Sequence, residues 1–153
     1  MARAFEIATE QLGGITVAVN CTGIVQAQRV LGAERLLAQA EFARVIAVNL
    51  IGAFTVCRAA ANRMQHNEPN AEGERGVIIN TASIAAYEGQ IGQAAYAASK
   101  GGVASLTLPL AREPRSASAS WPLRRVSSIP RCSQACPKRR APAWLCTSLF
   151  PSA

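Results

Sequence analysis

The chain has 153 residues, which is enough for one ordinary domain. Half of the residues are hydrophobic, 16% are charged and the mean hydropathy is +0.13, a composition that excludes a disordered polyampholyte. No hydrophobic run reaches about 18 residues and charges interrupt the N-terminal segment, so we expect neither a transmembrane helix nor a signal peptide. These features predict a soluble α/β chain in the cytoplasm.

Charge divides the chain into two parts near Glu113. Residues 1–113 contain nine Lys and Arg and nine Glu, whereas residues 114–153 contain seven Lys and Arg and no acidic residue. The last 40 residues therefore account for the whole net charge of +7, and they also hold six of the eight prolines. We predict an α/β part over residues 1–113 and a basic tail rich in Pro, Ser and Arg over residues 114–153.

The first predicted elements are a helix over residues 4–12 and a strand over residues 15–19. Gly13 and Gly14 end the helix. The strand is a short, continuous, apolar run rich in β-branched residues, which is typical of a parallel strand buried on both faces. A turn over residues 20–23 follows it, at the edge where open α/β sheets bind ligands.

The rest of the α/β part alternates helices with one more strand. Apolar residues at helical spacing over residues 34–64 predict two consecutive helices divided near Ala38–Glu41. A polar loop leads to a second buried strand over residues 76–81, and a long helix follows over residues 94–110. This order predicts βαβ units: two parallel strands with three or four helices.

Tyr96 and Lys100 are four residues apart on the last predicted helix, so both side chains lie on one face. A free tyrosine has a pKa of about 10, so it serves as a general acid–base near neutral pH only if this pKa falls by roughly three units. A neighbouring ammonium favours the phenolate and lowers a pKa by about 1–3 units. Alone, this spacing is more typical of an ordinary exposed helix pair.

Two further polar residues favour a chemical role. Ser83 lies thirteen residues before Tyr96, at the mouth of the second predicted strand, where a hydroxyl can reach a substrate oxygen. Asn49 lies in the middle of a predicted helix, which is an unfavourable position for a buried amide unless it has a specific partner.

These motifs make the chain resemble the short-chain dehydrogenase/reductase family. The matching motifs are Asn20-Cys21-Thr22-Gly23, Asn49-Leu50-x-Gly52-x-Phe54, Ser83 and Tyr96-Ala97-Ala98-Ser99-Lys100-Gly101-Gly102. The loop before Tyr96 also resembles that of the type-2 3-hydroxyacyl-CoA dehydrogenases, the type-10 17β-hydroxysteroid dehydrogenase group. The resemblance implies an oxidoreductase with a partial catalytic domain over residues 1–113, folded as part of a Rossmann-type, doubly wound parallel sheet.

The resemblance also implies roles for individual residues. It makes Tyr96 the acid–base, Ser83 the residue that polarises the carbonyl, and Lys100 a ligand of the nicotinamide ribose. It implies that Asn49 holds a water molecule that relays protons between Lys100 and solvent, and that Gln93 contacts the substrate. The residues expected to bind cofactor are Asn20, Cys21, Thr22, Gly23, Tyr96 and Lys100.

The implied ligands follow from the same resemblance. The cofactor would be NAD or NADP, with NAD favoured, and the substrate a secondary alcohol or ketone such as 3-hydroxyacyl-CoA. Members of the family are usually homo-oligomers. Neither a membrane nor a nucleic acid is an expected partner.

A dinucleotide site also needs a glycine-rich turn that opens a helix at the pyrophosphate. The sequence contains no G-x-x-x-G-x-G motif and no aspartate at all. By the family's order, three strands would precede residue 1, so we expect an N-terminally truncated and inactive fragment. Its two unpaired sheet edges would make it prone to aggregation.

The composition of residues 114–153 is typical of GC-rich codons read out of frame. With suitable codons, residues 115–122 read from the third base give Leu-Gly-Ile-Arg-Val-Leu-Ala, which supplies the next buried strand of the family. We therefore expect a frameshift near Glu113. The alternative is a genuine basic tail on a non-enzymatic module that binds nucleic acid electrostatically.

The five cysteines do not indicate a metal site. None forms a C-x-x-C pair and the chain has a single histidine, so zinc-ligand spacing is absent. A disulfide framework is also not expected without a signal peptide. We expect Cys57 to be a core thiol and His66 to lie in a solvated loop.

Overall fold

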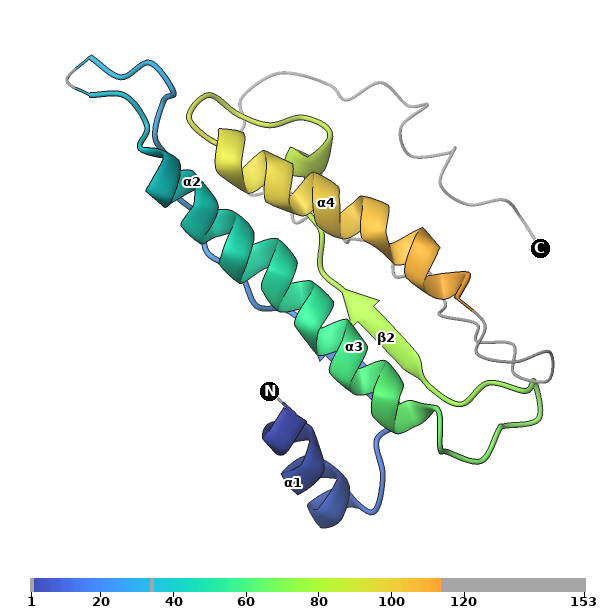
Figure 1. Ribbon diagram of the computed structural model, residues 1–153. Helices are drawn as coiled ribbons and strands as arrows, with labels where there is room; N and C mark the ends of the chain where they lie inside the picture. The colour runs from blue at the N-terminus through green and yellow to red at the C-terminus, as the bar shows by residue number, and fades with distance from the viewer. Residues whose placement is uncertain (1, 34, 114–153) are drawn as a thin grey trace, which may run out of the picture.

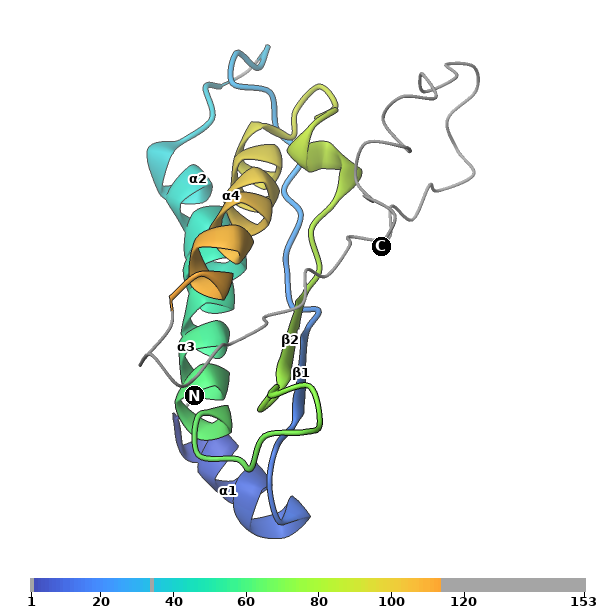
Figure 2. The same cartoon turned by 90° about the vertical axis from the view of Figure 1, so that its right-hand side faces the viewer.

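The computed structural model describes residues 2–33 and 35–113, and the predicted tail and frameshift lie outside them. Two strands pair in parallel, and helices lie along one side of them (Figures 1 and 2). In chain order the elements are α1 (Ala2–Leu12), β1 (Val17–Asn20), α2 (Gln39–Ile46), the π-helical turn η1 (Ala47–Ile51), α3 (Gly52–Met64), β2 (Val77–Asn80), the 3-10 turn η2 (Ile84–Ala86) and α4 (Ala94–Ala111). The predicted parallel α/β fold is confirmed.

The helical prediction for residues 34–64 was wrong in its first part. Helix begins only at Gln39 and continues as one rod through α2, η1 and α3 to Met64. Ala38 is extended, with ψ at 138°, and the preceding chain folds back so that the Leu37 amide donates to the Val30 carbonyl at 3.1 Å. Helical spacing alone did not reveal this competing backbone pairing.

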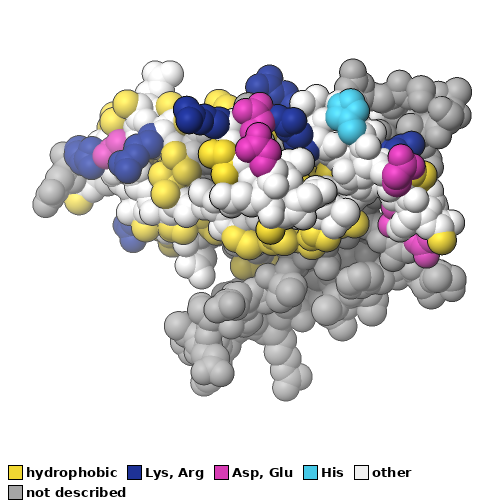
Figure 3. All heavy atoms as spheres, turned by 90° about the horizontal axis from the view of Figure 1, so that it is seen from below, with side chains coloured by type: hydrophobic (Ala, Val, Ile, Leu, Met, Phe, Trp, Pro, Cys, Tyr) yellow, Lys and Arg dark blue, Asp and Glu magenta, His cyan; other side chains and the backbone are white. Residues whose placement is uncertain are grey.

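Only one face of the sheet is covered by the described helices, contrary to the expected burial on both faces. Ala18 and Ile78 point to the helix layer and are buried, whereas Val17 and Val19 are 56% and 57% exposed. Figure 2 shows the reason, since the rod and α4 stand on the same side of the strands. Seen from below, hydrophobic side chains form a row along the described chain, with most Lys and Arg side chains on one side of it (Figure 3).

An apolar cluster lies between the helices and the two strands, at the end of the sheet where the strands begin. Its buried members are Ala18, Cys57, Ala60, Met64 and Ile78, with Phe5, Ile15, Ala61 and Leu110 packed around them. Packing is close: a Cβ on Gly76 would lie 2.7 Å from the Met64 Sδ. The prediction that Cys57 is a core thiol is confirmed, and so is the exposed position of His66.

Glycine lets α4 approach the rod closely at the other end of the layer. A Cβ on Gly102 would lie 2.7 Å from a methyl carbon of Leu50. The lack of a side chain there offsets the conformational cost of glycine within a helix. The close contact brings the faces of η1 and α4 that carry Asn49 and Lys100 together.

The rod is long and apolar enough to cross a membrane by length and composition alone. Its place in the fold is that of a central helix, because it packs against both strands and α4 and buries Asn49. Core helices of this kind often satisfy the same criterion, so it is weak evidence for a membrane span.

Candidate active site

Lys100 lies buried at the carboxyl end of the sheet. Its Nζ donates to the carbonyl of Thr81, just beyond β2, at 2.7 Å, and lies 5.9 Å from the centre of the Tyr96 ring. Only 5% of Lys100 is exposed. Burial lowers the pKa of Lys100 below its ordinary value, while the nearby Cys21 acts in the opposite direction. The spacing of Tyr96 and Lys100 therefore does place both groups on one face.

Asn49 is buried in the π-helical turn η1, the irregular part of the rod. Its Nδ2 donates to the Ile24 carbonyl at 2.9 Å and to Ser99 Oγ at 3.0 Å, and its Oδ1 accepts from the Ile24 amide at 2.8 Å. These bonds satisfy both donors of the amide and explain its tolerance within a helix. Single π-helical turns are frequent at functional sites. Whether Asn49 also holds a relay water remains a prediction.

Gly23 sits between the two polar side chains. A Cβ at this position would lie 3.4 Å from Asn49 Oδ1 and 3.5 Å from Lys100 Nζ, which is ordinary contact distance. Any larger side chain would extend into the space beside these two groups. Gly23 thus lies beside Asn49 and Lys100 at the carboxyl end of the sheet, and the cofactor-binding role of residues 20–23 stays a prediction.

Ser99 is the residue that sequence reasoning missed. It is completely buried, accepts from Asn49 and donates through Oγ to the Tyr96 carbonyl at 2.7 Å. It therefore connects η1 to the first turn of α4. Its position three residues after Tyr96, on the same helical face, was the available signal. We call Gly23, Ile24, Asn49, Thr81, Ser99 and Lys100 the polar network.

The predicted residues outside this network have other partners. Ser83 caps η2, where its Oγ accepts from the Ala85 amide at 3.2 Å, and it lies three residues beyond the end of β2. Gln93 immediately precedes α4, and its carbonyl accepts from the Ala97 amide at 2.7 Å. Both are half-buried and precede Tyr96 along the chain, and their catalytic and substrate roles remain predictions.

The turn residues divide between the core and the surface. The Asn20 side chain points to the helix layer, where Nδ2 donates to Asn80 Oδ1 at 3.4 Å. Cys57 Sγ donates to the same oxygen at 3.3 Å, and burial raises the pKa of the Cys57 thiol. Cys21, Thr22 and Gly23 are exposed, so of these residues they are the ones available to an approaching ligand.

The described residues fit one end of a nicotinamide cofactor. One hydrogen bond of the Lys100 ammonium, to Thr81, leaves donors for hydroxyl groups. By contrast, β1 is followed by irregular chain until Gln39, so it does not lead through a short glycine-rich turn into a helix. Among the described residues, no group of three or more His, Cys or Glu side chains could hold a metal ion.

Comparisons with known proteins identify related chains. The 3-hydroxyacyl-CoA dehydrogenase type-2 of Bos taurus is 54% identical over 112 residues, which cover 72% of this chain and 43% of the relative. The human (3R)-3-hydroxyacyl-CoA dehydrogenase is 44% identical over 98 residues, 64% of this chain and 34% of that protein. This chain thus spans less than half the length of these relatives.

A solved structure agrees with the sequence comparison. The crystal structure of 3-hydroxyacyl-CoA dehydrogenase type-2 from Mycobacterium avium superposes with a TM-score of 0.67 and 40% identity, covering 73% of this chain and 46% of that one. The profile of the short chain dehydrogenase family matches residues 1–118. The chain therefore belongs to the short chain dehydrogenase family.

Proposed function

We propose that residues 1–113 are the central part of an NAD(P)-linked dehydrogenase that interconverts a secondary alcohol and a ketone, with 3-hydroxyacyl-CoA as the substrate class and NAD as the favoured cofactor. The observation that carries the proposal is the polar network, which holds a buried Lys100 beside Tyr96 at the carboxyl end of the parallel strands. The names of the relatives support the substrate class.

Each residue would contribute a defined action. Tyr96 would give a proton to the ketone oxygen in reduction, or take it from the alcohol in oxidation. Lys100 would donate hydrogen bonds to the ribose hydroxyls beside Tyr96. Ser83 would donate its hydroxyl hydrogen to the substrate oxygen while its oxygen still accepts from the Ala85 amide, and Asn49 would keep Ile24 and α4 in place.

When bound, the nicotinamide cofactor supplies or accepts the hydride. Positioning the reactants contributes roughly 7–11 kcal/mol to lowering such a barrier. The 153-residue sequence has no glycine-rich pyrophosphate turn, so we propose that this polypeptide alone does not turn over. The nucleic-acid-binding alternative is not favoured, because the family profile accounts for residues 1–118.

The gene provides the test. We expect its nucleotide sequence to show an in-frame glycine-rich stretch upstream and a one-base insertion or deletion near the Glu113 codon. A repaired gene should yield a protein that binds a nicotinamide cofactor and reduces it in the presence of a 3-hydroxyacyl-CoA, as followed at 340 nm. Tight NAD binding or alcohol oxidation by the unrepaired chain would contradict the proposal of an inactive fragment.

A further inference from the structure

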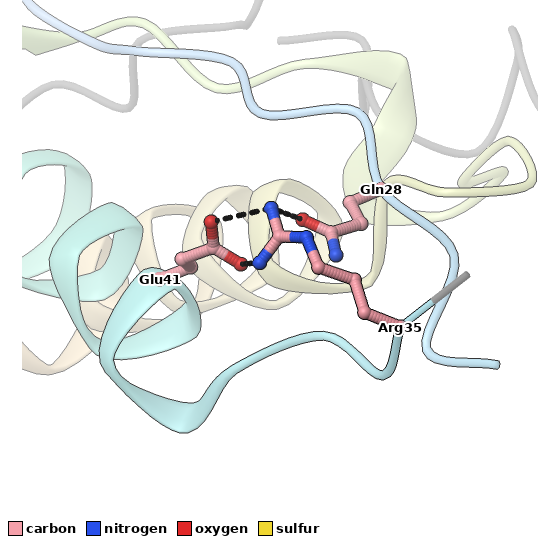
Figure 4. Close-up of polar contacts among 3 residues, drawn as sticks. All are labelled: Gln28, Arg35 and Glu41. Carbon is pink, nitrogen blue, oxygen red and sulfur yellow. Dashed lines mark hydrogen bonds and ion pairs between the residues drawn. The ribbon is translucent and has the colours of Figure 1, made fainter. Parts of the chain in front are cut away.

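A cluster of three polar residues fixes the irregular segment between β1 and α2 (Figure 4). Arg35 Nη1 donates to Glu41 Oε2 at 3.1 Å and Nη2 to Glu41 Oε1 at 3.0 Å, while Nη2 also donates to Gln28 Oε1 at 3.2 Å. This two-pronged contact of guanidinium with carboxylate is the geometrically most specific form of ion pair. The pairing also lowers the pKa of Glu41. The cluster thus ties Gln28 to the first turn of α2.

Gln28 is also connected to the loop that leads into α4. Its backbone amide donates to the Gly92 carbonyl at 2.8 Å. Gly92 has a φ of +85°, a conformation that favours glycine, and a Cβ there would lie 3.4 Å from the Gln28 nitrogen. Since Gly92 precedes Gln93 and the first turn of α4 contains Tyr96, the connection reaches the candidate active site within four residues.

At its start, the segment is held by the two hydrogen bonds between Ile24 and Asn49. Between Ile24 and α2, the backbone contacts within the described part of the segment are the Leu31–Leu36 bridge and the bond from the Leu37 amide to Val30. An exposed ion pair adds little to overall stability, and the Arg35 side chain is 62% exposed. Its geometry can nevertheless select one arrangement of a loop that has few other contacts.

We propose that Arg35 is a positioning residue: by holding Glu41 and Gln28 together, it fixes the loop over residues 88–93 and with it the entry into the first turn of α4. That this loop serves a substrate rests on the proposed function. The structural coupling between Arg35 and Gly92 does not depend on the proposed function, so it can be tested without cofactor or substrate.

Hydrogen–deuterium exchange of the full chain, resolved by peptide, tests the connection. The variants are Arg35→Met, Gln28→Ala and the charge swap that combines Arg35→Glu with Glu41→Arg. Arg63→Met is the matched control, because Arg63 forms a comparable exposed ion pair with Glu6, at 2.8 Å, between α3 and α1. Peptides from α3 report on global unfolding.

We expect Arg35→Met and Gln28→Ala to accelerate exchange roughly two- to fivefold in peptides over residues 24–33 and over residues 88–95, the range that follows from the strength of an exposed ion pair. The charge swap should restore protection in both segments, and Arg63→Met should change neither. Acceleration confined to residues 24–33 would overturn the proposal. Uniformly faster exchange, including α3, would also overturn it, because Arg35 would then be a general stability residue. Failure of the dehydrogenase assay would leave these exchange results intact and would contradict only the proposed function.

Discussion

The apolar cluster and the polar network lie at opposite ends of the same two strands and differ in the way they are held. Around Met64, small and flexible apolar side chains pack against one another. One of them, Cys57, also donates to Asn80, which lies outside the cluster. Around Asn49, the contacts are hydrogen bonds that connect η1, the turn after β1 and α4. The comparison indicates that one end chiefly stabilises the fold and that the other chiefly arranges chemical groups.

The largest expected effect is a cavity at the apolar end. Met64 is completely buried and lies against Gly76, so Met64→Ala should lower the free energy of unfolding by about 2–5 kcal/mol. Urea unfolding followed by circular dichroism measures this loss, and a variant that is already unfolded in buffer would agree with it. An unchanged midpoint would show that this end is not the main source of stability.

A smaller loss is expected at the polar end. Asn49→Ala leaves the Ile24 amide and carbonyl without their partner, but Ile24 is only half-buried and water can replace part of this bonding, so we expect a total loss of about 1–3 kcal/mol. Asn62, on the exposed side of α3, provides the control, since Asn62→Ala should stay within about 0.5 kcal/mol of the parent in the same urea experiment. Equal effects of the two substitutions would contradict the assigned role of the Asn49 amide.

The buried ammonium predicts a pH dependence of stability with a definite sign. Because burial lowers the pKa of Lys100, the unfolded chain binds more protons than the folded chain between the folded pKa and the ordinary value of about 10.4. The contribution of Lys100 to stability therefore increases as the pH rises through this window. The raised pKa of Cys57 acts oppositely, since stability is lost above the ordinary thiol pKa.

Comparison with Lys100→Met isolates the lysine, because Cys57 is common to both proteins. The free energy of unfolding, measured from pH 7 to pH 10, should rise more steeply with pH, or fall less steeply, in the parent than in the variant. The loss of the bond to Thr81 shifts the variant at every pH and does not alter this difference in slope. If the free energies of unfolding of the parent and of Lys100→Met changed with pH in parallel, the lowered pKa of Lys100 would be contradicted.

Much of this arrangement could be predicted from the sequence because it depends on local patterns. The two strands follow from short runs of β-branched residues, and Tyr96 and Lys100 share a face because α4 is a regular helix. The unhelical start before Gln39 could not be predicted, since it depends on backbone pairing and on Arg35. The exposure of Val17 and Val19 could not be predicted either, because it depends on which elements pack against each face of the sheet.

The central claim is that the polar end carries dehydrogenase chemistry, and a chimera tests it most directly. Residues 1–113 would replace the corresponding segment of the bovine 3-hydroxyacyl-CoA dehydrogenase type-2, to which this chain is 54% identical over 112 residues. The measurement is kcat for NAD-linked oxidation of a 3-hydroxyacyl-CoA, with Tyr96→Phe as the paired variant. We predict an active chimera whose kcat falls by about 10²–10⁴ in Tyr96→Phe, with an unchanged unfolding midpoint. A folded but inactive chimera, or full activity in Tyr96→Phe, would contradict the claim.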